Sequence, residues 1–445
     1  MSTPKTYHLM TLGCPKNDVD SEHFERMLTG GNLTSVDDPE GADAIIVNTC
    51  GFIEQSQAQS MEAVEELVAG KRAGQTLIVA GCMTQLYGRD VKERFPGVDH
   101  VFGVGQWGQV AGLLSVDVDA IYDIPDTPAK VTGGSAYLKI SDGCDAPCTF
   151  CVIPKIKGGL RSAPAGMLVK EAQRLVEAGA KELVLVAQDS TAWGEDMGLP
   201  VASGLPGLLE MLSEAAPDAW IRLMYAYPSR VSSTLIETMA RLPNVVPYLD
   251  VPLQHGSEAT LRRMKRPHNL EKVHGFIAEL RAAMPDVVLR TSLIVGFPGE
   301  TEEEFEEMVA FVRAIEFDHV GVFTYSRQQW TGAFEMAEQV PDAVKHDRRD
   351  RLMKIQQKIA GKRAQRFVGR DLEMLVEGMG EDEDGEPVIA GRTYREAPEV
   401  DGLVIAYGEA APGSMVKVRI DAAEGYDLFG RVLRPRRSAA VTRRR

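Results

Sequence analysis

Short apolar runs alternate with amphipathic stretches in the first quarter of the chain. Apolar runs at 6–12, 44–47 and 77–80 predict strands, and helical periodicity at 18–28 and 55–70 predicts helices between them. Strands that alternate with helices are typical of a parallel α/β sheet. We therefore predict a parallel α/β domain over residues 4–124.

A second series of strand and helix patterns begins after a stretch rich in Asp, Pro and Gly at 116–134, which predicts a linker. Strands are expected at 136–140, 182–187, 220–225, 248–251, 288–295 and 319–324, and helices at 165–178, 206–214, 232–240, 270–283 and 302–314. Six strand and helix units are too few for a closed eight-stranded barrel, but they suit a partial, open (βα)6 barrel. This domain is predicted to span residues 130–366.

The pattern then changes to short β-runs separated by Gly and Asp turns. These runs lie at 372–377, 388–392, 403–406, 415–420 and 430–433. Five short strands of this kind predict a small antiparallel β-barrel over residues 367–436, followed by a basic tail at 437–445. The fold class of the whole chain is therefore α/β with an added β-barrel.

Composition places the chain among ordinary globular proteins. Of its 445 residues, 44% are hydrophobic and 25% are charged. No run of eighteen apolar residues occurs, and the first ten residues lack the basic and then apolar pattern of a signal peptide. Six cysteines are too few for a disulfide scaffold of this size. We therefore expect a cytoplasmic protein without a membrane segment.

The charge is acidic overall and unevenly spread. A formal net charge of -15 argues against a general nucleic-acid coat protein, which needs a concentrated positive face. Residues 371–433 hold fifteen Asp or Glu against five Lys or Arg, whereas residues 342–370 hold ten Lys or Arg against three Asp. The basic helix predicted at 342–370 is either a solvated face or a surface that contacts RNA, and the arginine-rich tail could also reach RNA.

Three cysteines stand close together in one loop after the apolar run at 136–140. Cys144, Cys148 and Cys151 are separated by three and then two residues, in a segment punctuated by Gly and Pro. Three thiolates on a 4Fe-4S cube leave one iron open to a small molecule. A structural zinc would need a fourth Cys or His nearby, and none occurs between Pro154 and Pro200. Three unrelated core cysteines are the remaining alternative, which the clustering of rare thiols in a polar loop disfavours.

The other three cysteines each follow a predicted strand of the first domain. Cys14, Cys50 and Cys82 stand just past the carboxyl ends of the strands, and this is the edge where open parallel sheets hold ligands. A second site with three thiolates is therefore expected there. Single buried cysteines at strand ends are also common, so the spacing alone leaves both interpretations open.

Several strand ends of the second domain carry polar residues that could line the mouth of the partial barrel. Gln188, Asp189, Arg222 and Ser292 lie at or near such ends, and Gly296 lies at a turn where backbone could approach an adenine or a ribose closely. Each residue alone could also serve as a turn or a helix cap.

The loop at 144–151, with an aromatic residue before its last cysteine, resembles the signature of radical S-adenosylmethionine (SAM) enzymes. Nearly the whole chain resembles the methylthiotransferase family of these enzymes. The matching stretches are residues 12–17, 140–144, 153–162, 225–228 and 426–430. Within the family, the chain looks most like the members that modify an aspartate of ribosomal protein S-twelve, since the relatives that modify tRNA usually have Gln in place of Pro15 and lack the Tyr-Asp-Leu motif at 426–428. Glu424 and Gly425 depart from the continuous acidic run that is more frequent before that motif.

The resemblance implies two 4Fe-4S clusters and SAM as cofactors, with the C-terminal barrel, called a TRAM domain, docking the substrate. Cys144, Cys148 and Cys151 would hold the cluster that cleaves SAM to a radical. Cys14, Cys50 and Cys82 would hold an auxiliary cluster whose sulfur accepts a methyl group from a second SAM. Gln188, Asp189, Arg222, Ser292 and Gly296 are the expected SAM contacts.

In this reaction the radical removes hydrogen from the β-carbon of the target aspartate, which then takes the methylthio group. An unactivated C–H bond offers no acidic proton, so acid and base residues could not replace the cofactor. The expected partners are ribosomal protein S-twelve or the small ribosomal subunit, a low-potential electron donor and a sulfur source. The alternatives are a tRNA adenosine methylthiotransferase and a non-catalytic iron-sulfur scaffold or electron carrier.

Overall fold

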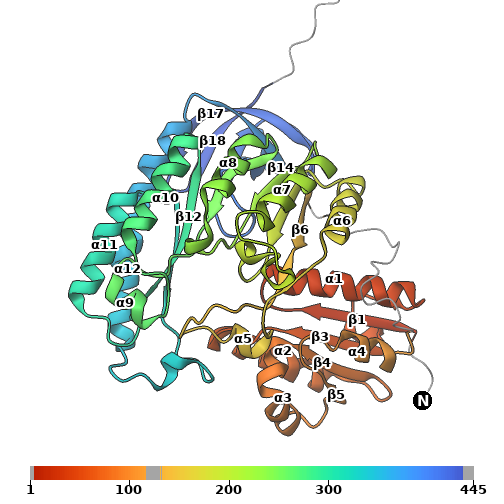
Figure 1. Cartoon of the computed structure of the whole chain (residues 1–445). Helices are drawn as coiled ribbons and strands as arrows, with labels where there is room; N and C mark the ends of the chain where they lie inside the picture. Colours follow the sequence, from red (N-terminus) through yellow and green to blue (C-terminus); the bar gives the residue numbers. More distant parts are fainter. Residues whose placement is uncertain (1–4, 117–130, 132, 434–445) are drawn as a thin grey trace, which may run out of the picture.

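Three main sheets form, one from each part of the chain, as Figure 1 shows. The computed structural model describes residues 5–116, 131 and 133–433. Nearly all of the predicted linker and the whole predicted tail at 437–445 lie outside the described residues. Within the described ranges, every helix is too short or too polar to cross a membrane.

The N-terminal sheet has five parallel strands in the order β2-β1-β3-β4-β5. Its elements are β1 (Thr6–Thr11), α1 (Pro15–Gly30), β2 (Thr34–Ser35), β3 (Ala44–Thr49), α2 (Glu54–Gly70), β4 (Thr76–Gly81), α3 (Cys82–Arg94), β5 (His100–Val101) and α4 (Trp107–Leu113). Helices α1 and α4 cover one face, and α2 and α3 cover the other. The predicted parallel α/β sheet is confirmed, while β2 and β5 were missed because two residues are too few to give an apolar run.

The second sheet has six parallel strands in the order β13-β12-β11-β10-β9-β6, with β13 and β6 at its two open edges. Its strands are β6 (Ser135–Lys139), β9 (Glu182–Val186), β10 (Trp220–Leu223), β11 (Val245–Asp250), β12 (Val288–Val295) and β13 (His319–Thr324). Its outer helices are α6 (Ala165–Glu177), α7 (Gly204–Ala215), α8 (Ser233–Arg241), α10 (Leu270–Ala283) and α11 (Glu302–Ile315). The largest apolar core lies between these strands and helices. The expected partial barrel is thus confirmed.

The third sheet is a closed barrel with the order β14-β15-β16-β18-β17. Its strands are β14 (Asp371–Glu381), β15 (Pro387–Arg392), β16 (Val404–Tyr407), β17 (Met415–Glu424) and β18 (Asp427–Val432). Neighbouring strands are antiparallel except β16 and β18, which are parallel. Strand β17 pairs with β14 on one side and with β18 on the other. Strand β18 therefore lies between β17 and β16, and it runs parallel to β16.

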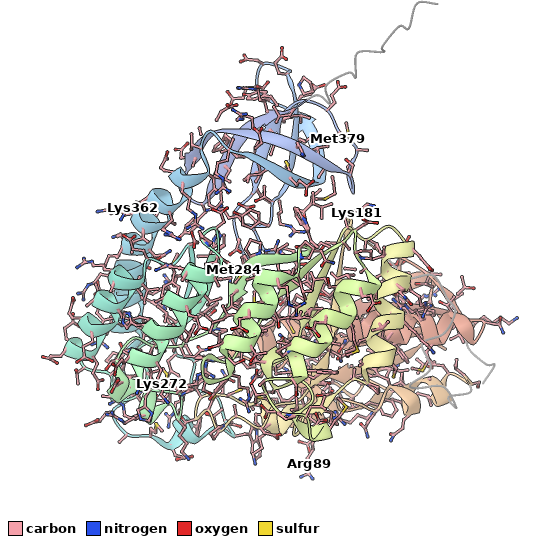
Figure 2. The ribbon with its side chains drawn as sticks, turned by 45° about the horizontal axis from the view of Figure 1, so that its top comes forward. Arg89, Lys181, Lys272, Met284, Lys362 and Met379 are labelled. Carbon is pink, nitrogen blue, oxygen red and sulfur yellow. The ribbon has the colours of Figure 1, made fainter. Side chains whose placement is uncertain are left out.

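Most cations of the basic helix α12 (Asp342–Ala364) are used inside the chain. The helix runs alongside α11 (Figure 1). Arg348 Nη1 lies 2.7 Å from a carboxylate oxygen of Glu300, and Arg363 Nε lies 3.2 Å from one of Asp318. Lys362 also pairs with Glu316 at the end of α11 and points outward in Figure 2. The positive charge that the sequence offers for RNA contact is therefore much reduced.

Buried charges join the small barrel to the inner face of the second sheet. Arg222 Nε on β10 lies 2.7 Å from Glu182 Oε1 on β9, and neither side chain is exposed. Arg392 of the small barrel binds the other oxygen of Glu182 at 2.7 Å, and Arg222 Nη1 donates to the carbonyl of Tyr394 at 2.7 Å. Apolar side chains from both sheets form one core around this network. Such paired charges fix one relative orientation of the two units.

Replacing Arg222 with Leu should weaken the interface between the small barrel and the second sheet, here called the seam, because Glu182 would keep only one of its two cations. Removing one partner of a buried ion pair costs about 3–5 kcal/mol, and we expect a loss of the free energy of unfolding near the lower end of that range. Urea denaturation measures it. Arg431→Leu is the matched control, since it breaks an exposed pair with Asp421 and should cost about 1 kcal/mol or less. Equal losses for the two variants would contradict the prediction.

Candidate functional site

A two-stranded ribbon closes the loop that carries the second cysteine trio, Cys144, Cys148 and Cys151. Strand β7 (Ser141–Asp142) pairs with β8 (Arg161–Ser162), and the N–H of Cys144 donates to the carbonyl of Gly158 at 3.1 Å. Gly143 adopts φ +75°, and a Cβ there would collide with the backbone that faces it. Glycine is therefore required at this turn, which holds the loop beside the carboxyl end of β6.

Each thiol of this loop has a hydrogen-bond donor close to its sulfur. The backbone N–H of Ala146 lies 3.4 Å from Cys144 Sγ, that of Ile153 lies 3.4 Å from Cys151 Sγ, and Arg266 Nη1 lies 3.7 Å from Cys148 Sγ. Burial raises the pKa of Cys151 to about 12 and also raises that of Cys144. Thiolates at these positions therefore need compensating positive charge, which bound iron would supply and which these donors assist.

The first cysteine trio meets at one edge of the N-terminal sheet. Cys14 follows β1, Cys50 follows β3 and Cys82 begins α3 directly after β4. These three strands are neighbours in register. Helices α1 and α2 leave this edge on opposite faces, so the trio lies at the switch point where open parallel sheets bind ligands.

Gly13 and Asn17 set the packing of the first trio. Gly13 has φ +107°, and a Cβ there would lie 2.6 Å from Cys50 Cβ and 2.8 Å from Cys50 Sγ. The Asn17 side chain donates to the carbonyl of Leu12 at 2.8 Å, and its oxygen accepts from Cys82 Sγ at 3.7 Å. Asn17 thus ties two strand ends to the third thiol, a role that the sequence alone did not reveal.

The two trios lie next to one another. Cys82 packs in a single apolar cluster with Val152, which directly follows Cys151, and with Ile156. Burial raises the pKa of Cys82 to about 12. The first trio, through Cys82, therefore lies beside residues that follow the second trio in the chain.

A buried ion network crosses the boundary between the two sheets. Lys157, whose side chain is 3% exposed, lies 2.9 Å from a carboxylate oxygen of Asp20 on α1 and 3.5 Å from one of Asp142 on β7. Lys139 on β6 also pairs with Asp20. Burial would raise the pKa of Asp20, but the two ammonium groups hold it well below its usual value. Sequence reasoning missed this network because its members are distant along the chain.

In the described part of the chain, no three His, Cys, Asp or Glu side chains stand close enough together to bind one metal ion. The ligands of a 4Fe-4S cube bind separate irons and therefore stand further apart than ligands of one ion. Neither trio thus offers a mononuclear zinc site, whereas both offer the donor chemistry of a cube.

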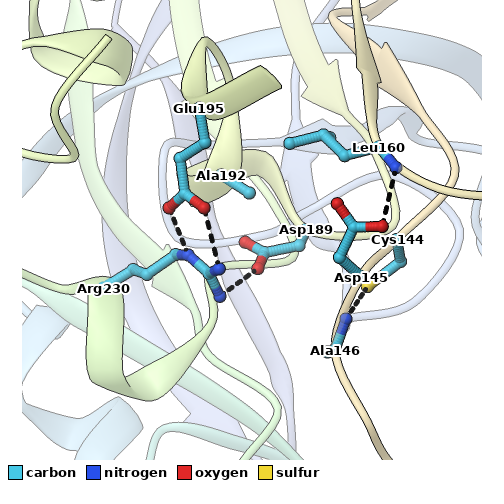
Figure 3. Close-up of a pocket in the computed structure, with 8 residues that line it drawn as sticks. All are labelled: Cys144, Asp145, Ala146, Leu160, Asp189, Ala192, Glu195 and Arg230. Atoms are coloured by element: carbon cyan, nitrogen blue, oxygen red, sulfur yellow. Dashed lines mark hydrogen bonds and ion pairs between the residues drawn. The ribbon is translucent and has the colours of Figure 1, made fainter. Parts of the chain in front are cut away.

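A small pocket adjoins Cys144, as Figure 3 shows. Arg230 bridges two acids in its wall, with 3.1 Å to Asp189 Oδ2 and 2.6 Å to Glu195 Oε1. Asp189 also accepts hydrogen bonds from the backbone and hydroxyl of Thr191. The predicted residue Asp189 is therefore beside the cysteine loop, with its carboxylate already paired.

Gln188, which precedes Asp189, has a side-chain oxygen that accepts no hydrogen bond from the described residues. Its Nε2 donates to Asp142 Oδ1 at 3.1 Å, while its buried Oε1 has no partner among the described residues. The buried hydroxyls of Ser141 and Ser190 likewise lack partners there. Buried polar atoms are normally hydrogen-bonded, so each of these three atoms could accept a contact from a bound ligand.

The other three predicted contacts are placed differently. Ser292 is half-buried on β12, and the N–H of Gly296 already donates to Glu300 Oε2 at 2.8 Å. Arg222 is fully buried in the seam with the small barrel, where Glu182 and backbone carbonyls take its donors. We therefore correct the expectation for Arg222, since its side chain faces the small barrel rather than the mouth.

Two residues at the barrel mouth have strained backbones. Tyr225, just past β10, has φ +60°, and Gln254, just past β11, has φ +77°. Such conformations cost energy in residues other than glycine and gather at functional sites. Positive φ values at these positions are decided by tertiary contacts and leave no signal in the sequence.

Three family models match the chain in succession. They are "Uncharacterized protein family UPF0004" over residues 6–103, "Radical SAM superfamily" over residues 138–312 and "TRAM domain" over residues 368–433. Each match falls on one of the three sheets.

Curated relatives match over nearly the whole chain. A protein of Herpetosiphon aurantiacus named "Ribosomal protein uS12 methylthiotransferase RimO" is 43% identical, covering 96% of this chain and 100% of the relative. A protein of Anaeromyxobacter sp. with the same name is 45% identical, covering 97% of this chain and 94% of the relative.

Solved structures share the fold at low identity. The radical SAM methyltransferase TsrM from Kitasatospora setae, with cobalamin and a [4Fe-4S] cluster bound, has a TM-score of 0.56 at 15% identity and covers 74% of this chain and 77% of its own. The cobalamin-dependent SAM radical enzyme OxsB has a TM-score of 0.53 at 12% identity and covers 80% of this chain and 56% of its own.

Gly13→Ala should disrupt the first trio selectively. The new Cβ would overlap Cys50, so we expect iron uptake at this trio to be lost while iron bound by the second trio remains. Iron content after anaerobic reconstitution measures this, and if each trio holds one 4Fe-4S cube, about half of the wild-type iron should be retained. Gly74→Ala is the matched control, because Gly74 also has positive φ but has open space around its Cβ position. Full iron content in Gly13→Ala would refute the assigned packing.

Proposed function

The chain belongs to the RimO family of ribosomal protein uS12 methylthiotransferases, and we propose that it adds a methylthio group to the β-carbon of an aspartate in uS12. It is a radical SAM enzyme that uses SAM and an iron-sulfur cluster. The observation that carries the proposal is the side-by-side placement of two three-thiol sets. The tRNA alternative is not favoured, because the full-length relatives carry the uS12 name.

We propose that Cys144, Cys148 and Cys151 hold the cluster that binds SAM, and that Cys14, Cys50 and Cys82 hold a second 4Fe-4S cluster. Each trio supplies three thiols, and three thiolates on a cube of four irons leave one iron open. When bound, these groups supply the electron, the radical chemistry and the activated sulfur that no amino-acid side chain could provide.

The chain's own residues hold and orient these groups. Arg266 and backbone N–H groups offset the negative charge of the second trio's thiolates. Lys157 offers the same compensation to Cys82 from within its ion network. That network also fixes the two trios relative to one another, and orientation is a large part of the rate advantage of any two-centre reaction.

For SAM itself, we propose contacts from Gln188 and Asp189. Gln188 Oε1 is a buried acceptor that lacks a donor among the residues described here, so it suits an ammonium or hydroxyl group. Asp189 lines the pocket beside Cys144 and is held by Arg230. Ser292 and Gly296 remain proposed contacts on β12, where Ser292 is half-exposed to the mouth.

Charge complementarity supports the small barrel as the docking unit for uS12. Its β14–β15 turn, at 381–386, carries five acidic residues and lies on the outer side of this barrel, near Met379 in Figure 2. An acidic surface attracts a basic ribosomal protein more readily than tRNA. RNA contact would fall to exposed helix lysines such as Lys358 and to the tail.

Other parts of the expected organisation remain proposals. These are domain boundaries at 4–124, 130–366 and 367–436, a tail at 437–445, an external low-potential electron donor, an external sulfur source, and action in the cytoplasm. The small ribosomal subunit, rather than free uS12, is an equally suitable form of the substrate.

Single cysteine variants separate the two proposed clusters. With SAM and dithionite, wild-type protein should form 5'-deoxyadenosine and methylthiolate recombinant uS12, detected by mass spectrometry. Cys148→Ala should lose both activities, whereas Cys50→Ala should lose methylthiolation and keep 5'-deoxyadenosine formation, each variant retaining about four of eight irons.

Three results would contradict the proposal. Methylthiolation of tRNA but not of uS12 by the wild-type protein would select the tRNA alternative. No 5'-deoxyadenosine from the wild-type protein would select the electron-carrier alternative. Unchanged uS12 modification by Cys50→Ala would remove the second cluster from the reaction.

A further inference from the structure

Lys16 links the first thiol trio to the mouth of the partial barrel. It lies in the first turn of α1, two residues after Cys14. Its ammonium group reaches across the boundary between the sheets and lies 3.7 Å from the centroid of the Tyr225 ring, just past the end of β10. The cation therefore stands where the two halves of the site meet.

The charge of Lys16 is held in place without being neutralised. An aromatic ring attracts an ammonium group through its quadrupole but carries no net charge. Among the described residues, no carboxylate forms an ion pair with Lys16. By contrast, Lys157 and Arg230 at the same site each contact two acids. Lys16 thus keeps its charge available for an anion that arrives from outside.

The partial barrel fixes the backbone of Tyr225, whose ring lies beneath Lys16. The N–H of Tyr225 donates to Asp250 Oδ2 at 3.0 Å, and its carbonyl accepts from the N–H of Ser190 at 3.1 Å. Its backbone is in the strained region at φ +60°. Strain of this kind persists only where surrounding contacts impose it, and it is typical of residues that position a functional group.

A carboxylate that enters this site needs such a cation. The chain carries a net charge of -15, and Asp142, Asp189 and Glu195 lie around the second trio. An unpaired carboxylate that leaves water for this environment would be opposed by desolvation and by repulsion. The start of α1, with its partial positive charge, adds to the attraction that Lys16 exerts on an anion.

We propose that Lys16 binds the side-chain carboxylate of the target aspartate and so selects an acidic residue beside the reacting carbon. This inference rests on the proposed function. The same chemistry would suit the carboxylate of SAM, so the experiment has to separate the two sources.

The test pairs variants of Lys16 with variants of the substrate. Lys16→Met should lower kcat/KM for uS12 by about tenfold to a hundredfold, the usual loss when a hydrogen-bonded charge pair is broken. Lys16→Arg should recover most of that activity. Lys272→Met, which removes an exposed lysine of α10, should behave as wild type.

Substrate with the target aspartate changed to asparagine completes a double-mutant cycle. Wild-type enzyme should lose about tenfold or more on this substrate, whereas Lys16→Met should lose little further activity. Formation of 5'-deoxyadenosine without uS12, the KM for SAM and the electron paramagnetic resonance spectra of the clusters should not change in Lys16→Met. A purely structural role would alter those three readouts.

Three outcomes would contradict the inference, and each identifies which assumption is wrong. If wild-type enzyme modifies uS12 and Lys16→Met does so equally well, the inference is wrong and the proposed function stands. A raised KM for SAM with slower 5'-deoxyadenosine formation would assign Lys16 to the SAM carboxylate and overturn the inference. Failure of the wild-type enzyme to modify uS12 would overturn the proposed function, and the inference with it.

Discussion

The buried contact of Lys157 with Asp20 and Asp142 is the constraint on which the arrangement of the site depends. The two thiol trios belong to separate parallel sheets, and each sheet could form its own core without the other. An ammonium group taken out of water must meet carboxylates in a defined geometry, because unpaired burial is very costly. A buried cation therefore gives the boundary between the sheets one preferred register. The apolar contact of Cys82 with Val152 and Ile156 then brings the trios together.

A second buried ion network joins the small barrel to the second sheet. Arg222, Glu182 and Arg392 are buried together at the inner face of the strands, while the carboxyl ends of the strands remain free for chemistry. Tyr426 of the Tyr-Asp-Leu motif also lies at this seam, stacked at 6.3 Å from His319. The barrel thus has two functions. Its inner side closes the sheet, and its acidic outer turn is available to a basic partner.

The strand ends of the site carry several features that the protein alone leaves strained or incomplete, and features of both kinds also occur elsewhere in the described chain. Tyr225 and Gln254 have strained backbones, and within the described part of the chain the buried oxygens of Gln188 and Ser190 have no hydrogen-bond partner and Lys16 has no ion-pair partner. Elsewhere, charges such as those of α12 are mostly paired within the chain. Local violations of this kind are expected where a protein binds ligands, since ligands complete the missing contacts.

Hydrophobic periodicity and turn residues act locally, so the amino-acid pattern alone predicted the three main sheets, except for the short strands β2 and β5, and the position of each thiol. It placed Cys14, Cys50 and Cys82 at strand ends, and the resemblance of its motifs identified the family. Only the tertiary structure decided which charges meet. It directed Arg222 to the seam with the small barrel and made β16 and β18 parallel. These outcomes depend on contacts between residues far apart in the chain, and local patterns carry no record of such contacts.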